Sequence, residues 1–322
     1  MLNTLDSAAG WVQENALVPM LWQFGLIQWE EVSQGWAVFA IYGAVQVLAT
    51  YAICVPLEMW RPVERWPDVR AVATDMIYTL ISRVGILPLV TFVLFYQVQV
   101  ELTGFVVDHG WVQPTLERFA PVLLGHPLLV FCLYAVILDF SDYWRHRLSH
   151  AYGWWWALHS LHHAQRQMTF WSDDRNHILD DIIAALWFGT VATLIGVPPL
   201  QFPILVLVLR FLESLSHANA RVWFGWLGER LLVSPRFHRA HHGVLGAGCR
   251  SANYGAILPI WDIMFGTADF SREFVPTGDP TGSEALASGG YFEQQWAGVR
   301  RFAGALAPHR QSSRMTAGSN PR

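Results

Sequence analysis

The chain has 322 residues, of which 53% are apolar and only 14% are charged, and its mean hydropathy is +0.27. This composition excludes an ordinary soluble protein and is typical of an integral membrane protein. The formal net charge of −4 leaves no overall basic field for nucleic acid, so we expect no nucleic-acid partner. The three cysteines form no CxxC pair, and the sequence therefore indicates neither a disulfide framework nor a thiolate zinc site.

Residues 1–35 are predicted to form an interfacial segment on the membrane surface. The segment is acidic and carries scattered tryptophans, which favour the membrane–water boundary. It lacks the basic and apolar regions of a cleaved signal peptide. A first span is expected at residues 36–55, because about 20 apolar residues cross a bilayer core as a helix. Pro56 is expected to end it.

Further apolar stretches are predicted to be membrane-embedded helices, at residues 76–98, 121–138, 182–197 and 202–215. Arg83 and Pro88 interrupt the first of them, which indicates a kink. Residues 101–120 form a polar connection. Pro198 and Pro199 separate the last two stretches, which are typical of a helical hairpin. The predicted fold class is therefore an all-α integral membrane protein with four to five spanning or embedded helices.

Arginines in short loops predict which side of the membrane each segment occupies, because positively charged loops stay cytoplasmic. Arginine is absent before residue 36 and occurs once in residues 101–120. It is frequent in residues 61–70 and around the histidines discussed next. The histidines are therefore expected in a helical cap on the cytoplasmic side of a bacterial inner membrane. Residues 36–272 are predicted to form one membrane domain, and residues 273–322 a tail that is disordered from residue 311.

Ten of the thirteen histidines lie between His146 and His242. They include one HxxxH pair and two HxxHH triplets: His146 and His150; His159, His162 and His163; His238, His241 and His242. On helices, each group presents its imidazoles from one face. Neutral imidazole is the commonest metal ligand, and an all-nitrogen shell suits iron, zinc, copper or nickel. So many convergent histidines favour two metal ions.

Two further histidines are weighed separately. His217 ends the last apolar stretch, which returns it to the side of the other histidines, so we expect it to be a ligand. His177 is treated as an optional ligand or as a group that hydrogen-bonds to one.

Carboxylates near these histidines are candidates to orient them, since a metal-bound imidazole usually donates its other N–H to a carboxylate or carbonyl. The candidates are Asp139, Asp142, Asp173, Asp174, Asp180 and Asp181, with Asn219 and Asn253 as further polar candidates. Helix capping or solvation is the expected role for roughly half of the aspartates. Trp154, Trp155 and Trp156 are predicted to anchor the chain at the interface, in preference to stacking on a substrate.

Several motifs occur in a fixed order: DFSDYWRHRLSH (139–150), HSLHH (159–163), HAN (217–219), SPRFHRAHH (234–242) and NYGAILPIWDIMFGT (253–267). This set resembles the fatty acid hydroxylase and sterol desaturase superfamily of membrane lipid oxygenases, over about residues 131–267. Its ending is most similar to bacterial sterol-desaturase-family proteins and to the alkylglycerol monooxygenase branch. The resemblance implies a di-iron centre held by the pair and both triplets, with His217 joining them.

The sequence departs from the family pattern at two positions. Ile178 follows His177, where many members carry a proline after the histidine. Arg221 stands where some fatty acid 2-hydroxylases have a further histidine, which argues against that branch. The chain also lacks an HPGG-type cytochrome b5 segment, so the resemblance implies a separate electron donor of the ferredoxin or cytochrome b5 type.

The resemblance implies an enzyme that uses two iron ions and O₂ to oxidise an unactivated C–H bond. The substrate would be a sterol, a fatty acyl chain or a related lipid that enters from the bilayer, and the ligand pattern does not choose between hydroxylation and desaturation. One alternative is a histidine-rich metal transporter, whose ligands should lie within the spans. Another is a zinc-dependent membrane hydrolase, which needs fewer histidines, an open coordination position and a carboxylate base. Zinc could also occupy the iron sites in purified protein.

Overall fold

The computed structural model describes residues 2–65, 68–112, 114–197, 202–244, 251–270 and 274–307. These residues form helices and no named strand, with one isolated β-bridge between Gly243 and Thr277. Three helical segments among them are long and apolar enough to cross a membrane: Ile27–Trp60, Pro127–Ala151 and Ile178–Ile195. The predicted all-α membrane fold is confirmed, while the total of four to five embedded helices stays a prediction.

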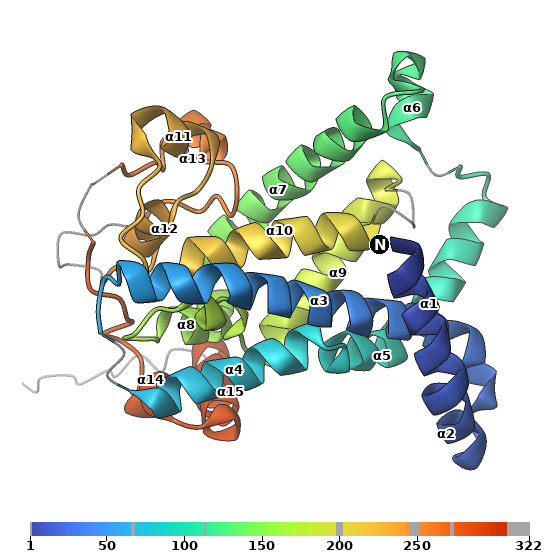
Figure 1. The fold of residues 1–322 in the computed structure, drawn as a ribbon, viewed down its shortest axis with the longest axis horizontal. Helices are drawn as coiled ribbons and strands as arrows, with labels where there is room; N and C mark the ends of the chain where they lie inside the picture. Colours follow the sequence, from blue (N-terminus) through green and yellow to red (C-terminus); the bar gives the residue numbers. More distant parts are fainter. Residues whose placement is uncertain are drawn as a thin grey trace, which may run out of the picture.

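The helices follow one another as α1 (Leu2–Val12), α2 (Val18–Gln23), α3 (Glu30–Trp60), α4 (Val69–Arg83), α5 (Ile86–Asp108), α6 (Leu116–Phe119), α7 (Pro127–Ala151), α8 (Gly153–His163), α9 (Ile178–Ile195), α10 (Phe202–His217), α11 (Gly225–Leu231), α12 (Pro235–His241), α13 (Ile260–Phe265), α14 (Glu284–Ser288) and α15 (Tyr291–Leu306). In Figure 1, α3, α4 and α10 run along the length of the molecule. Helices α12 and α14 lie at one end, and α1, α2 and α6 lie at the other.

The first long helix does not end at Pro56, so that prediction was wrong. Helix α3 continues to Trp60 with Pro56 inside it. Glu58, two residues later, is buried and accepts hydrogen bonds from the backbone N–H groups of Phe170 (2.9 Å) and Asn219 (2.8 Å). These tertiary contacts hold the last turn of α3 helical where the proline on its own would favour an end.

The apolar stretch at residues 76–98 is two helices instead of one kinked span. The break lies at Gly85, which has φ of +99°, a conformation that glycine adopts without steric cost. The Gly85 carbonyl accepts a hydrogen bond from the Trp36 indole at 2.7 Å. Residue 88 falls in the first turn of α5, where a proline removes no intrahelical hydrogen bond. Helix α5 also continues into the stretch predicted as a polar connection.

The segments at either end of the predicted membrane domain contain helices that pack on the histidine-bearing region or on α3. Ala9 of α1 and Leu17 form a small core with Ala37 of α3, and α3 itself begins before residue 36. Helix α15, within the predicted tail, packs along α8. The predicted disorder from residue 311 lies outside the described residues, and the three-part division of the chain stays a prediction.

Helices α7, α9 and α10 enclose a space near the histidines. The third span begins at Pro127 and not at residue 121, and α7 continues through both histidines of the HxxxH pair. At their other ends these helices share one apolar cluster, in which Tyr134 and Leu205 are fully buried. The Tyr134 hydroxyl donates to the Gly196 carbonyl at 2.9 Å, closing the bundle there.

Helix α3 packs closely on Arg83, the last residue of α4, at Gly43. Substitution of this glycine tests how much the close contact contributes to stability. A Cβ at Gly43 would lie 1.8 Å from the Arg83 carbonyl oxygen, so Gly43→Ala should force the helices apart at a cost of about 1–3 kcal/mol. Gly35 of the same helix has no atom within 4 Å of such a Cβ. Gly35→Ala should be neutral or stabilising by up to about 1 kcal/mol. Thermal unfolding of both variants in one detergent measures the difference; equal melting temperatures would contradict this packing.

Candidate metal centre

Nine histidines, from α7, α8, α10, α12 and the residue that follows α12, meet in two adjacent groups. Group A contains five, His146, His150, His159, His163 and His241, and group B contains four, His162, His217, His238 and His242. Within each group, one ring nitrogen of every member lies within 4.8 Å of the others. The groups touch, because the His163 and His242 rings stack at 4.3 Å between centroids. The sequence patterns therefore do converge, and His217 is included.

The two triplets contribute to both groups in a reciprocal way. In α8, the outer residues His159 and His163 belong to group A, and His162 belongs to group B. At α12, the outer residues His238 and His242 belong to group B, and the middle one belongs to group A. Each triplet therefore bridges the two groups, which ties their relative position to two short helices.

Most group A rings have one nitrogen tied to a fixed acceptor. The Nδ1 atoms of His146 and His241 donate to the carbonyls of Tyr254 (2.9 Å) and Ala252 (2.7 Å). The Nδ1 of His159 lies 2.9 Å from an Asp180 carboxylate oxygen. A carbonyl can only accept, so Nδ1 carries the proton and Nε2 keeps its lone pair. This is the tautomer and orientation that metal-ligating histidines adopt.

The opposite nitrogens of group A meet no partner within the described residues. There, the Nε2 atoms of all five rings are buried and make no hydrogen bond, whereas native proteins pair nearly all buried polar atoms. Leaving each one unpaired costs about 1–3 kcal/mol. Five convergent lone pairs are the donor set for a metal ion such as iron or zinc, and bonding to one would satisfy them. The residues present therefore fit a bound metal.

Group B presents the same chemistry in a closer arrangement. The Nε2 of His217 lies 3.2 Å from that of His162 and 3.0 Å from that of His238, which is 3.1 Å from that of His242. Nitrogens that bind one metal at about 2.1 Å lie about 3 Å apart when adjacent in its shell. A second metal therefore fits group B.

Burial keeps these imidazoles in the form that binds metal. Burial, followed by the neighbouring rings, holds the pKa values of His162, His163, His238 and His242 well below the ordinary value. Burial also lowers the pKa of His241 to about 3. These rings are therefore neutral near pH 7, as coordination requires.

A loop after α12 supplies the carbonyls that hold His146 and His241. Asp262 accepts from the backbone N–H groups of Tyr254 (2.8 Å) and Gly255 (2.7 Å). Asp139 of α7 accepts from Ile257, Leu258 and the Trp261 indole at 2.8–3.1 Å. Asn253 has φ of +59° and donates to the carbonyls of Phe237 and Asp269 at 2.9 Å each. Asp139 and Asn253 therefore act on the histidines through this loop and not by direct contact.

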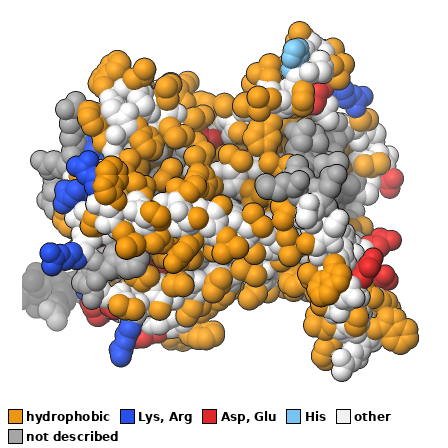
Figure 2. All heavy atoms as spheres, in the orientation of Figure 1, with side chains coloured by type: hydrophobic (Ala, Val, Ile, Leu, Met, Phe, Trp, Pro, Cys, Tyr) orange, Lys and Arg blue, Asp and Glu red, His pale blue; other side chains and the backbone are white. Residues whose placement is uncertain are grey.

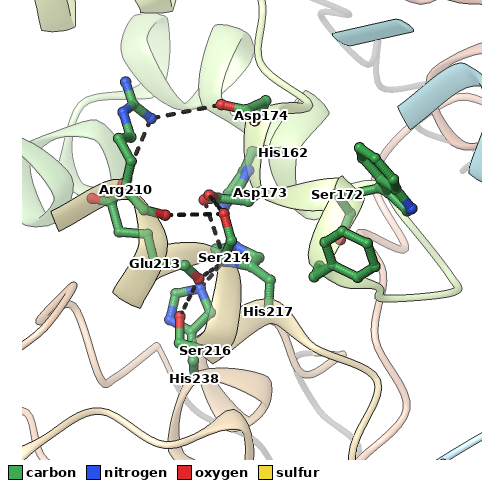
Figure 3. A network of polar contacts seen from close by, with 12 residues as sticks. His162, Ser172, Asp173, Asp174, Arg210, Glu213, Ser214, Ser216, His217 and His238 are labelled. Carbon is green, nitrogen blue, oxygen red and sulfur yellow. Dashed lines mark hydrogen bonds and ion pairs between the residues drawn. The ribbon is translucent and has the colours of Figure 1, made fainter. Parts of the chain in front are cut away.

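Two carboxylates do contact imidazoles. Asp180 accepts from His159 and, at 2.8 Å, from the Trp155 indole. Trp155 is therefore buried, and its prediction as an interfacial anchor was wrong. Asp173 lies 3.4 Å from the His217 Nδ1, whose hydrogen bond goes to the Glu213 carbonyl at 2.8 Å. Figure 3 shows Asp173 beside Ser214 and His217, two side chains of α10.

The remaining candidates hold neighbouring structure instead of the rings. Asp142 pairs with Arg145 at 2.6 Å, and Asp174 pairs with Arg83 at 2.6 Å. Asn219 accepts from Val63 and Glu64 at 3.1 Å each, which ties the loop after α3 to the end of α10. In the part of the chain that the structure describes, none of these three side chains hydrogen-bonds to an imidazole.

His177 lies outside both groups. Its Nε2 lies 3.0 Å from the Gln295 carbonyl, and its Nδ1 accepts from the Leu179 N–H at 3.2 Å. It therefore caps α9 and holds α15. Sequence reasoning had assigned no role to the Tyr254 and Ala252 carbonyls or to Asp262. The NYG…WD motif was a signal for this loop, but backbone acceptors leave no residue pattern of their own.

A cavity of about 730 Å³ opens from the histidines into the bundle. His146, His159, His162, His217 and His238 line one end of it. Along α10 the lining runs from His217 through Glu213 and Arg210 to Leu209 and Val206, and along α7 from His146 through Arg145 and Asp142 to Leu138. We call Arg83, Asp142, Arg145, Asp181, Arg210 and Glu213 the charged collar. It lies between the histidines and an apolar lumen formed by side chains of α5, α9 and α10.

The hydrogen bond from His159 to Asp180 can be tested directly. In Asp180→Asn, one of the two donors, His159 or Trp155, would face an amide NH₂ instead of an oxygen. We expect metal affinity to fall about 10–100-fold, measured by metal content against chelator concentration. Asp181→Asn is the matched control, since the neighbouring Asp181 lines the cavity and, in the described part of the chain, makes no hydrogen bond to an imidazole. Equal metal retention in both variants would contradict the role of Asp180.

Comparison with known proteins places this site in a family. The fatty acid hydroxylase family model matches residues 131–267. Ornithine lipid hydroxylase OlsE of Rhizobium tropici is 30% identical over 230 residues, which cover 69% of this chain and 66% of that protein. Alkylglycerol monooxygenase of Caenorhabditis elegans is 31% identical over 147 residues, 46% of this chain and 28% of that protein. The human alkylglycerol monooxygenase is 30% identical over 141 residues, which cover 44% of this chain and 31% of that protein.

The chain spans 66% of the length of the first of these relatives, and 28% and 31% of the other two. No solved structure matches it. The matched residues contain every histidine of groups A and B together with the loop that orients them. Through residues 131–267, the chain belongs to the fatty acid hydroxylase family of the fatty acid hydroxylase and sterol desaturase superfamily.

Proposed function

We propose that this protein is a membrane-bound di-iron enzyme that hydroxylates a lipid with O₂. The observation that carries the proposal is the pairing of two all-histidine groups with one cavity, whose far lining is apolar. A soluble substrate would need no such lumen. A lipid tail fits it, with the carbon to be oxidised at the histidine end.

The side chains around the cavity define what the protein contributes. Two irons, when bound, would supply the electrons that activate O₂ and the oxidising power to break an unactivated C–H bond. Group A would hold one ion and group B the other. The apolar lining excludes water from the bound chain, and Asp180 and the Tyr254 and Ala252 carbonyls keep the rings in place.

Hydroxylation is proposed in preference to desaturation because the relatives described above are named as a hydroxylase and as monooxygenases. The reaction RH + O₂ + 2 e⁻ + 2 H⁺ → ROH + H₂O needs two electrons from outside the chain. A separate ferredoxin or cytochrome b5 type protein would supply them. The names of the relatives offer two substrate classes for this chain, a lipid with a charged headgroup (ornithine lipid) and an uncharged alkylglycerol.

The distribution of charge supports a membrane orientation with the metal centre on the cytoplasmic side. Figure 2 shows most visible basic side chains at the end where α12 and α14 lie, whereas acidic side chains are visible at both ends. One basic side chain lies over α6 at the other end. This distribution fits the rule that positively charged loops stay cytoplasmic, and we propose a bacterial inner membrane.

The two alternative functions have less support from the site. A transporter needs ligands along a path through the spans, whereas only His146 and His150 lie on a candidate span, and both are in its last two turns. A zinc hydrolase needs about three protein ligands and one open position. Nine convergent imidazoles exceed that requirement.

Metal content and lipid oxidation test this proposal together. Purified protein should hold two irons per chain, and His162→Ala should lose iron and abolish O₂-dependent lipid oxidation while still inserting into membranes. His177→Asn is the control: asparagine can still cap α9, so both iron and activity should be retained. Zinc in the protein with ion flux in vesicles, or full activity in His162→Ala, would refute the proposal.

A further inference from the structure

The charged collar contains one ion pair, Arg210 with Glu213, whose side chains are not hydrogen-bonded to the surrounding fold within the described residues. Arg83 binds Asp173 and Asp174, and Arg145 binds Asp142. The Arg210 guanidinium, in contrast, lies 3.6 Å from a Glu213 oxygen and 3.8 Å from an Asp174 oxygen. Both separations exceed a normal hydrogen bond. In the described residues, the side chains of Arg210 and Glu213 make no hydrogen bond at all.

Both groups remain accessible from the cavity that they line. The Arg210 side chain is 36% exposed and the Glu213 side chain 19%. Figure 3 shows Arg210 and Glu213 projecting from α10, with Asp174 opposite Arg210. A guanidinium has five N–H donors in a planar fork that matches a carboxylate or phosphate. Glu213 offers the complementary acceptor for an ammonium group.

An uncharged lipid would be a poor occupant of this place. Hydrocarbon laid against a loosely paired arginine and glutamate would remove their water without replacing its hydrogen bonds, which is costly for ions. A headgroup with one anion and one cation would instead satisfy both.

The position of the pair on α10 sets how close a headgroup would come to the metal centre. Arg210, Glu213 and His217 are spaced i, i+3 and i+7, so they share one face of the helix. Glu213 is one turn before His217, and its carbonyl holds the His217 ring. A headgroup bound by this pair therefore lies within about one to two helical turns, roughly 5–10 Å, of a proposed ligand.

We propose that Arg210 and Glu213 form a headgroup site that selects a zwitterionic lipid, with Arg210 binding its carboxylate or phosphate and Glu213 its ammonium group. The C–H bond oxidised then lies in the headgroup or in the chain segment next to it, and the tails fill the apolar lumen. This inference rests on the proposed lipid hydroxylase function and narrows its substrate class.

Binding measurements on the iron-loaded protein in detergent test the site without relying on turnover. The probes are ornithine lipid, which carries a carboxylate and an ammonium, phosphatidylethanolamine, which carries a phosphate and an ammonium, and an uncharged 1-O-alkylglycerol. Native mass spectrometry or quenching of tryptophan fluorescence gives the affinities. We expect both zwitterionic lipids to bind at least tenfold more tightly than the alkylglycerol, and the ratio between them identifies which anion the site prefers.

Variants separate the headgroup site from general stability. Arg210→Gln and Glu213→Gln should each weaken binding of the preferred zwitterionic lipid about 10–100-fold, the usual effect of losing a charge-assisted hydrogen bond, and change alkylglycerol binding less than about twofold. Arg210→Lys should restore part of the affinity, and Arg300→Gln, at an exposed position of α15, should change nothing. Iron content should stay at the wild-type level in all four.

Two results would overturn this inference: equal binding of charged and uncharged lipids, or Arg210→Gln and Glu213→Gln proteins with unchanged zwitterion binding. Failure of the proposed hydroxylase function would give a different result from failure of the headgroup site. Protein that holds no iron and oxidises no lipid, but still selects zwitterionic lipids through Arg210 and Glu213, would refute the enzyme and leave the headgroup site standing.

Discussion

The whole arrangement depends on how the nitrogens of nine convergent imidazoles are satisfied. For His146, His241, His217 and His159, Nδ1 has an acceptor from the protein, three of them backbone carbonyls and the fourth Asp180. Within the described residues, the Nε2 lone pair of every group A ring is buried and meets no hydrogen-bond donor. Burying so many unpaired acceptors carries a large desolvation cost, which coordination of a metal ion would remove.

Hydrogen bonds to two carboxylates explain why elements far apart in the chain meet at the candidate metal centre. Asp139, on a span, holds the loop that supplies carbonyls to two histidines. Asp180, at the start of another span, holds α8 through His159 and Trp155. The centre is therefore fastened to the membrane helices by carboxylates, so distortion of one helix would reach several rings.

The same helices define the cavity, and their order of residues is informative. Moving away from the histidines along α7 and α10, the lining changes from imidazole to charged to apolar. An amphiphilic lipid would match this order with its charged headgroup closest to the histidines and its apolar tail in the lumen. Within the collar, Arg83 is hydrogen-bonded to two aspartates, whereas Arg210 lies 3.6 Å from Glu213 and 3.8 Å from Asp174, which is the reason that we propose Arg210 as the ligand-binding cation.

The sequence by itself determined the membrane class, the all-α fold and the histidines of both groups, because hydropathy and i, i+4 spacing are local properties. Only the tertiary structure decided that Pro56 lies inside α3, that Gly85 divides two helices, and that His177 caps α9. It also decided how each triplet divides between the groups and which carbonyls orient the rings. Those features depend on contacts between residues distant in the chain and on backbone atoms, which no residue pattern records.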